Sequence, residues 1–100
     1  MLQPCRIALT AALAATVERV RMFGSAALDL VWVAEGRTDA CVMLSNKPWD
    51  TAAGVLIARE AGALVLDSTS RRHSLESPDT IAASPAIADQ LMAVVEASIC

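Results

Sequence analysis

The sequence predicts an α/β fold in which helices and short strands form layers. Helix-type and strand-type patterns alternate along the chain, and strands separated by helices are typical of layered α/β proteins. The strand-type runs are short and apolar and are followed by turn-forming residues, as expected of buried strands. The chain has 100 residues, so it forms one small domain or part of a larger one.

Each element follows from a local pattern. Apolar residues at three- and four-residue spacing, or alanine- and leucine-rich composition, predict helices at residues 7–18, 26–34, 48–61 and 85–97. Short apolar runs predict strands at residues 20–23, 38–44, 63–66 and 80–83. Ser25 and Ser84 are suitable N-caps, and Pro85 is expected at the first position of the last helix. Gly36 and Gly62 are expected just past the ends of the second and third helices.

The segment KPWDTAAG, residues 47–54, is the most informative part of the chain. Pro48 favours a helix start because its backbone angle is preset and its missing amide hydrogen is not needed there. Asp50 therefore falls in the first turn, where the helix dipole favours an ionised carboxylate. From this place a carboxylate can hold a hard cation such as Mg²⁺. The alternative interpretation is an ordinary helix start with an N-terminal acid.

Composition argues against several classes of function. The net charge is −3 and no basic stripe is present, which argues against a nucleic-acid partner. No run approaches the roughly 18 uncharged apolar residues of a membrane span. Cys5, Cys41 and Cys100 have no paired spacing, which indicates reduced thiols in the cytoplasm. Residues 6–17 resemble a secretory signal, but the same residues form a plausible amphipathic helix, which is the favoured interpretation. The hydrophobic content, 55%, exceeds what a lone domain of this length buries comfortably and indicates a partner surface.

Four segments carry a resemblance to a known family: RMFGSAALDL at 21–30, VAEGRTDA at 33–40, PWDTAAG at 48–54 and EAG at 60–62. Together they resemble the C-terminal half of the inositol monophosphatase family, and the combination of the Trp-Asp-x-Ala-Ala-Gly and Gly-Ser-Ala-Ala-Leu segments is specific. The resemblance runs from about Val20 to Glu96. It divides the chain into an N-terminal helix at 1–19 and a family-like subdomain at 20–97.

The resemblance implies a Mg²⁺-dependent phosphomonoester hydrolase, commonly dimeric, with the layered fold of the sugar phosphatases. In such enzymes metal ions polarise the phosphate and activate a water molecule. Asp50 would be a metal ligand and would also reach a substrate hydroxyl. Gly24, Ser25 and Ala26 would line the pocket for a sugar alcohol, although a plain turn and cap is the alternative for this segment. No catalytic residue is assigned to this chain.

The sequence also departs from the family pattern. The family's remaining metal ligands lie in a Glu-Glu motif and an Asp-Pro-x-Asp-Gly-Thr/Ser motif, and neither occurs in these 100 residues. One carboxylate alone does not complete a near-octahedral Mg²⁺ site. Met43 stands seven residues before Asp50, where the family often has a glutamate that contacts inositol, and a thioether accepts hydrogen bonds poorly.

Two hypotheses follow. The first is the C-terminal part of a phosphatase that acts on inositol phosphate or a related sugar phosphate, inactive alone and completed by a chain that bears the missing acidic motifs. Its expected partners are a small phosphomonoester and either a second copy of the chain, in a homo-oligomer, or the missing N-terminal half. The second is a non-catalytic interaction or oligomerisation module derived from the same family.

Other polar residues have plainer interpretations. Residues 68–78 lack periodicity and are predicted to form a surface loop, in which His73 is a solvated histidine. Asp29 and Asp39 are predicted to be solvated or capping acids.

Overall fold

The computed structural model describes residues 3–16, 26–43, 48–74 and 76–98, with only the backbone described at 3–6, 16, 26–27 and 48–50. Its helices are α1 (Gln3–Thr16), α2 (Ala26–Glu35), α3 (Pro48–Glu60) and α4 (Ala88–Ser98). Its strands are β1 (Ala40–Met43), β2 (Leu64–Leu66) and β3 (Thr80–Ala83). The predicted strand at 20–23 lies outside the described residues. None of the helices in the described ranges is long and apolar enough to cross a membrane.

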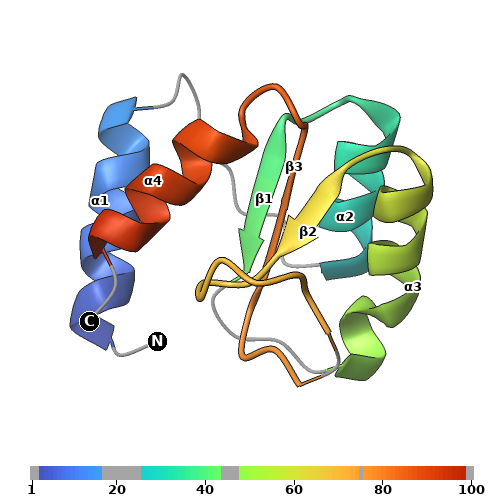
Figure 1. The fold of residues 1–100 in the computed structure, drawn as a ribbon, viewed down its shortest axis with the longest axis horizontal. Coiled ribbons are helices and arrows are strands. Elements are labelled where there is room, and N and C mark those ends of the chain that lie inside the picture. The colour runs from blue at the N-terminus through green and yellow to red at the C-terminus, as the bar shows by residue number, and fades with distance from the viewer. Residues whose placement is uncertain (1–2, 17–25, 44–47, 75, 99–100) are drawn as a thin grey trace.

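The three strands form one sheet between two layers of helices, which confirms the predicted α/β layering. The strand order is β1-β3-β2, and the central strand β3 is antiparallel to both neighbours. Figure 1 shows α2 and α3 on one face of the sheet and α1 and α4 on the other. All four residues of β3 are buried, because helices cover both faces of the central strand.

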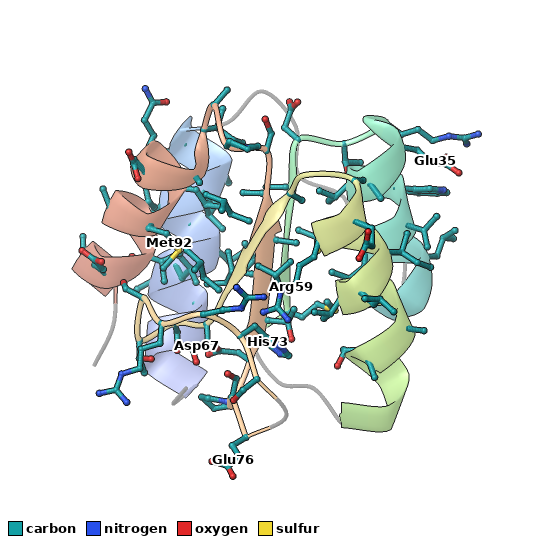
Figure 2. The ribbon with its side chains drawn as sticks, turned by 45° about the vertical axis from the view of Figure 1, so that its right-hand side comes forward. Glu35, Arg59, Asp67, His73, Glu76 and Met92 are labelled. Atoms are coloured by element: carbon teal, nitrogen blue, oxygen red, sulfur yellow. The ribbon has the colours of Figure 1, made fainter. Side chains whose placement is uncertain are left out.

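Side chains alternate along β3 between two hydrophobic cores, as expected for a strand buried on both faces. Ile81 and Ala83 belong to the core beneath α1 and α4, which also contains Leu9, Met92 and Val95. Figure 2 shows Met92 pointing from α4 toward this layer. The second core lies beneath α2 and α3 and contains Leu30, Val33, Val55, Ala58, Val65 and Ala82. Burying one leucine or isoleucine side chain contributes about 1.5–3 kcal/mol.

The two helices that carry the family motifs end as predicted. Gly36 has a φ of 79° and Gly62 a φ of 92°, conformations that residues with a Cβ adopt only with strain. At the end of α3 the amide of Gly62 donates to the Arg59 carbonyl and the amide of Ala63 donates to the Ala58 carbonyl. These are the two bonds of a Schellman motif, which satisfies carbonyls at the helix end.

Two helix boundaries differ from the prediction. α1 begins at Gln3 rather than at residue 7, because Pro4 is tolerated in a first helical turn. α4 begins at Ala88, so the placement of Pro85 at the first helical position is wrong. The residues between Ser84 and Ala88 form a turn closed by the Ile87 amide and the Ser84 carbonyl. Proline suits the second position of such a turn as well as a helix start, so the Ser-Pro pattern fits both structures.

Leu9 of α1 lies in the same core as residues of α4, so this helix is packed onto the rest of the described chain. The division between residues 19 and 20 stays a prediction.

Candidate functional site

Two helices that carry parts of the family motifs begin toward the same end of the molecule (Figure 1). α2 starts at Ala26, and Asp50 lies in the first turn of α3. Figure 1 shows these helices side by side and running in the same direction, from the end of the sheet where β1 and β2 finish. The first amides of a helix lack partners within the helix and attract anions, so this end suits a phosphate ligand.

The structure places only part of the predicted site. It brings the backbones of Ala26 and Asp50 to the same end of the α2–α3 layer. Gly24 and Ser25 lie outside the described residues, and the side chains of Ala26 and Asp50 are not described. Their predicted roles in binding metal and substrate therefore stay predictions.

α3 is anchored to the sheet directly after Asp50. Thr51 is fully buried, and Gly54, Val55 and Ala58 continue the buried face at helical spacing. Val55 and Ala58 pack into the core shared with α2. The buried face of α3 therefore begins at Thr51, directly after Asp50, and packing along this face holds the start of the helix in place.

Asp29, near the start of α2, is not the solvated or capping acid that the sequence predicts. Its Oδ1 atom is buried and has no hydrogen-bond partner within the described part of the chain. Burial raises the pKa of Asp29. Asp39, by contrast, is exposed as predicted.

Cys41 lies on β1 near Asp29. The pKa of the Cys41 thiol is raised to about 12, mainly by burial and to a smaller extent by the charge of Asp29, while a backbone hydrogen bond at Ala82 opposes the shift. This thiol is therefore protonated and poorly nucleophilic at neutral pH.

A second polar region, which the sequence reading missed, follows β2. The Asp67 amide donates to the Arg71 carbonyl at 2.9 Å, and the His73 amide donates to the Val65 carbonyl at 3.0 Å. Arg72 also bridges to Leu66, so residues 71–73 fold back along β2. The turn between them includes Ser70 in the left-handed region, with a φ of 65°.

His73 is buried, with 7% of its surface exposed, so its assignment as a solvated loop histidine is wrong. Its Nε2 atom lies 2.8 Å from Thr80 Oγ1, and its carbonyl accepts a hydrogen bond from Arg59 at 2.6 Å. Figure 2 shows Arg59 reaching from α3 toward His73, with Asp67 beside the histidine. Burial and the charge of Arg59 lower the pKa of His73, and the charges of Asp67 and Asp79 oppose this shift.

Two buried carboxylates hold this region together. Asp67 accepts hydrogen bonds from the Thr69 amide at 2.9 Å, the Arg71 amide at 3.3 Å and the Ser77 hydroxyl at 2.7 Å, and also from the Thr69 hydroxyl. Burial pushes the pKa of Asp67 up, but these hydrogen bonds outweigh burial and the pKa is lowered. Asp79 is fully buried and its Oδ1 atom accepts from the Ser68 amide at 2.7 Å.

The sequence held a weak signal for this region. Asp-Ser-Thr-Ser at 67–70 is typical of a tight turn stabilised by an aspartate side chain. Recognising that turn predicts that the residues after it pair with β2, which brings His73 next to Val65.

Comparison with known proteins agrees with the motifs. The sequence model of the inositol monophosphatase family matches residues 4–99. The chain belongs to this family. Inositol-1-monophosphatase SuhB of Mycobacterium tuberculosis is 51% identical over 80 residues, which cover 80% of this chain and 27% of that protein. A protein named putative Nus factor SuhB, from Neisseria meningitidis, is 43% identical over 79 residues, or 79% of this chain and 30% of that protein.

Solved structures of the family share the fold. An IMPase of Thermotoga maritima superposes with a TM-score of 0.87 at 31% identity, covering 98% of this chain and 39% of that one. The extragenic suppressor protein suhB of Bartonella henselae superposes with a TM-score of 0.88 at 35% identity, covering 95% and 37%. This chain therefore spans about a third of the length of its relatives.

The residues present do not build a magnesium site by themselves. No group of three or more histidine, cysteine, aspartate or glutamate residues suited to a metal occurs within the described ranges. Asp50 offers one carboxylate, whereas a Mg²⁺ site uses several oxygen ligands. We therefore derive no catalytic step for this chain alone.

Proposed function

We propose that this chain is the C-terminal part of a Mg²⁺-dependent phosphomonoester hydrolase of the inositol monophosphatase type. The observation that carries the proposal is the position of Asp50, in the first turn of α3 and at the same end of the layer as the start of α2. Family membership supports it. The remaining metal ligands must come from a second segment, because the Glu-Glu and Asp-Pro-x-Asp-Gly motifs are absent from these residues.

In this proposal Asp50 supplies one carboxylate to Mg²⁺ and reaches a substrate hydroxyl. Gly24, Ser25 and Ala26 line the sugar-alcohol pocket. Bound metal would polarise the phosphate and activate water for attack on phosphorus. The substrate is an inositol phosphate or a related sugar phosphate. Met43 favours a related sugar phosphate, because this half-buried thioether packs against the core beneath α2 and α3 and supplies no carboxylate to an inositol hydroxyl.

The proposed partners are a small phosphomonoester and either the N-terminal half of the enzyme or a second copy of this chain. We place the protein in the cytoplasm, since its cysteines show no paired spacing and the described thiol of Cys41 is free. The net charge of −3 supports the absence of a direct nucleic-acid partner.

The test is phosphate release by the purified chain, alone and mixed with a polypeptide that bears the two missing acidic motifs. We expect no release by the chain alone and Mg²⁺-dependent release by the mixture. Asp50→Asn should lower the activity of the mixture at least about 100-fold, because it removes a ligand of an ion that contributes several kcal/mol to the reaction. The matched control is Asp89→Asn, which changes an exposed acid in the first turn of α4. Phosphate release by the chain alone, or full activity of Asp50→Asn, would contradict the proposal.

A non-catalytic interaction module is the second candidate. It is favoured by exposed apolar residues on the outer helices, where Leu56 is 60%, Ile57 45% and Leu28 40% exposed. Relatives from Vibrio cholerae and Pasteurella multocida are named Nus factor SuhB rather than for a phosphatase. Under this alternative Asp50→Asn leaves partner binding unchanged, whereas charged substitutions at Leu56 and Ile57 weaken it.

A further inference from the structure

Gly54 lies at a close contact between α3 and α2. A Cβ atom built on Gly54 would lie 2.7 Å from Cδ1 of Leu30 and 2.9 Å from its Cβ. Carbon atoms in ordinary contact are about 3.5–4.0 Å apart. A residue larger than glycine therefore does not fit at position 54 while the two helices keep their present separation.

Leu30 cannot simply move away from an added methyl group. Its side chain is fully buried, and it packs with Val33 and Val55 in the core beneath the two helices. Its Cβ is fixed to the backbone of α2, so a change of rotamer leaves that contact in place. The added atom must therefore push the helices apart by roughly 1 Å, the difference between 2.7–2.9 Å and ordinary carbon contact.

The position of this contact relates it to the proposed site. Gly54 is four residues after Asp50, and Leu30 is four residues after Ala26, which is about one helical turn in each case. The helices run in the same direction from the end where they begin (Figure 1). The contact thus lies about one turn beyond Ala26 in α2 and about one turn beyond Asp50 in α3, and it controls how far apart these two first turns are held.

We propose that Gly54 is a positioning residue, whose missing side chain sets the separation between the first turn of α3, which carries Asp50, and the start of α2 at Ala26. This inference rests on the proposed function, in which the two groups hold metal and substrate together. Gly54 itself touches neither ligand and acts through the backbones of α2 and α3. Because reacting groups must be aligned closely, a displacement of about 1 Å can lower a rate about 100-fold.

The variant to make is Gly54→Ala. In the mixture with the polypeptide that bears the acidic motifs, kcat per folded chain should fall about 100-fold. The folded fraction is measured by circular dichroism, so that loss of fold is separated from loss of geometry. Crystal structures of the wild-type and variant chains should show the starts of α2 and α3 about 1 Å further apart in the variant.

Gly62→Ala is the matched control. It makes the same chemical change at the end of the same helix, where nothing lies within 4 Å of an added Cβ. Its positive φ makes the substitution strained, so the variant loses stability without pressing on α2. It should keep kcat per folded chain. Adding Leu30→Ala to Gly54→Ala removes the clash with Cδ1 and should recover part of the lost kcat.

Three results are decisive. An unchanged separation of the helix starts in Gly54→Ala overturns the inference. Equal kcat per folded chain in Gly54→Ala and Gly62→Ala also overturns it. If the wild-type mixture releases no phosphate, the proposed function fails instead, and the helix separation alone decides whether Gly54 is a spacer.

Discussion

The start of the α2–α3 layer and the segment after β2 both contain aspartates. The hydrogen bonding and the pKa shifts of these aspartates differ between the two regions. Asp67 accepts four hydrogen bonds from its own loop and keeps a low pKa. Asp29 has a buried oxygen without a partner among the described residues, and its pKa is raised. Buried polar groups are nearly always satisfied in folded proteins, so a satisfied carboxylate indicates structure. Asp79, which directly precedes β3, lies between these two cases, because its Oδ1 atom accepts from the Ser68 amide while its buried Oδ2 atom has no partner among the described residues.

The largest expected effect is at Asp67, whose carboxylate accepts four hydrogen bonds. Asp67→Ala should lower the free energy of unfolding by about 2 kcal/mol, because it removes a buried carboxylate that accepts hydrogen bonds from partly buried donors of Thr69, Arg71 and Ser77. Urea denaturation at neutral pH measures the change. The control, Asp39→Ala, alters an exposed acid and should change stability by less than about 0.5 kcal/mol. Similar losses in both variants would contradict a structural role for Asp67.

The Asp67 carboxylate also makes the free energy of unfolding depend on pH. Since the folded pKa of Asp67 is lowered, its stabilising effect is complete above the ordinary aspartate pKa of about 3.9. It is lost as the pH falls through the folded value. Asp67→Asn should therefore show a smaller loss of stability on acidification than the wild type does.

A smaller effect, at milder pH, is expected from His73. The folded pKa of His73 is lowered, so as the pH falls through about 6.5 the unfolded chain takes up a proton before the folded chain does. Stability should fall as the pH drops from about 7.5 to 5.5, on the order of 1 kcal/mol or less. His73→Gln, which keeps a hydrogen-bonding group beside Thr80 but does not titrate in this range, should remove that slope. Thermal melting at several pH values distinguishes the two, and parallel pH profiles would show that His73 does not titrate on unfolding.

The smallest effect is expected at Asp29, whose buried Oδ1 atom has no hydrogen-bond partner among the described residues. Asp29→Asn removes a half-buried charge and should raise the free energy of unfolding at neutral pH by about 0.5 kcal/mol. In the wild type, protonation favours the fold, so stability should rise as the pH falls through the raised pKa of Asp29. Asp39→Asn is the control. Destabilisation by Asp29→Asn would mean that the charged form of Asp29 is stabilised by a partner, as the carboxylate of Asp67 is.

Predictions from the sequence were correct where a local pattern is compatible with only one structure. β3 was predicted to the residue, at 80–83, because four apolar-compatible residues lie between turn formers. α2 and α3 were predicted to within a residue at each end, because Pro48, Gly36 and Gly62 are strong boundary signals. It failed at Pro85, where the same dipeptide fits a turn and a helix start.

The candidate site was predicted only through its motif. The Trp49-Asp50 signature identified the family and placed Asp50 in a helix start, but neither composition nor spacing could pair that start with Ala26 on another helix. The role of Gly54 could not be predicted either, because the sequence around a helical glycine does not show which residue packs against it.

The sequence by itself determined the α/β class, the family and the helix on which Asp50 sits, since these depend on periodicity and short motifs within one segment. Only the tertiary structure decided that α2 and α3 begin at the same end, that Gly54 contacts Leu30, and that His73 is buried. These features depend on contacts between residues that are distant in the sequence. Burial and hydrogen bonding are properties of that packing rather than of any one residue.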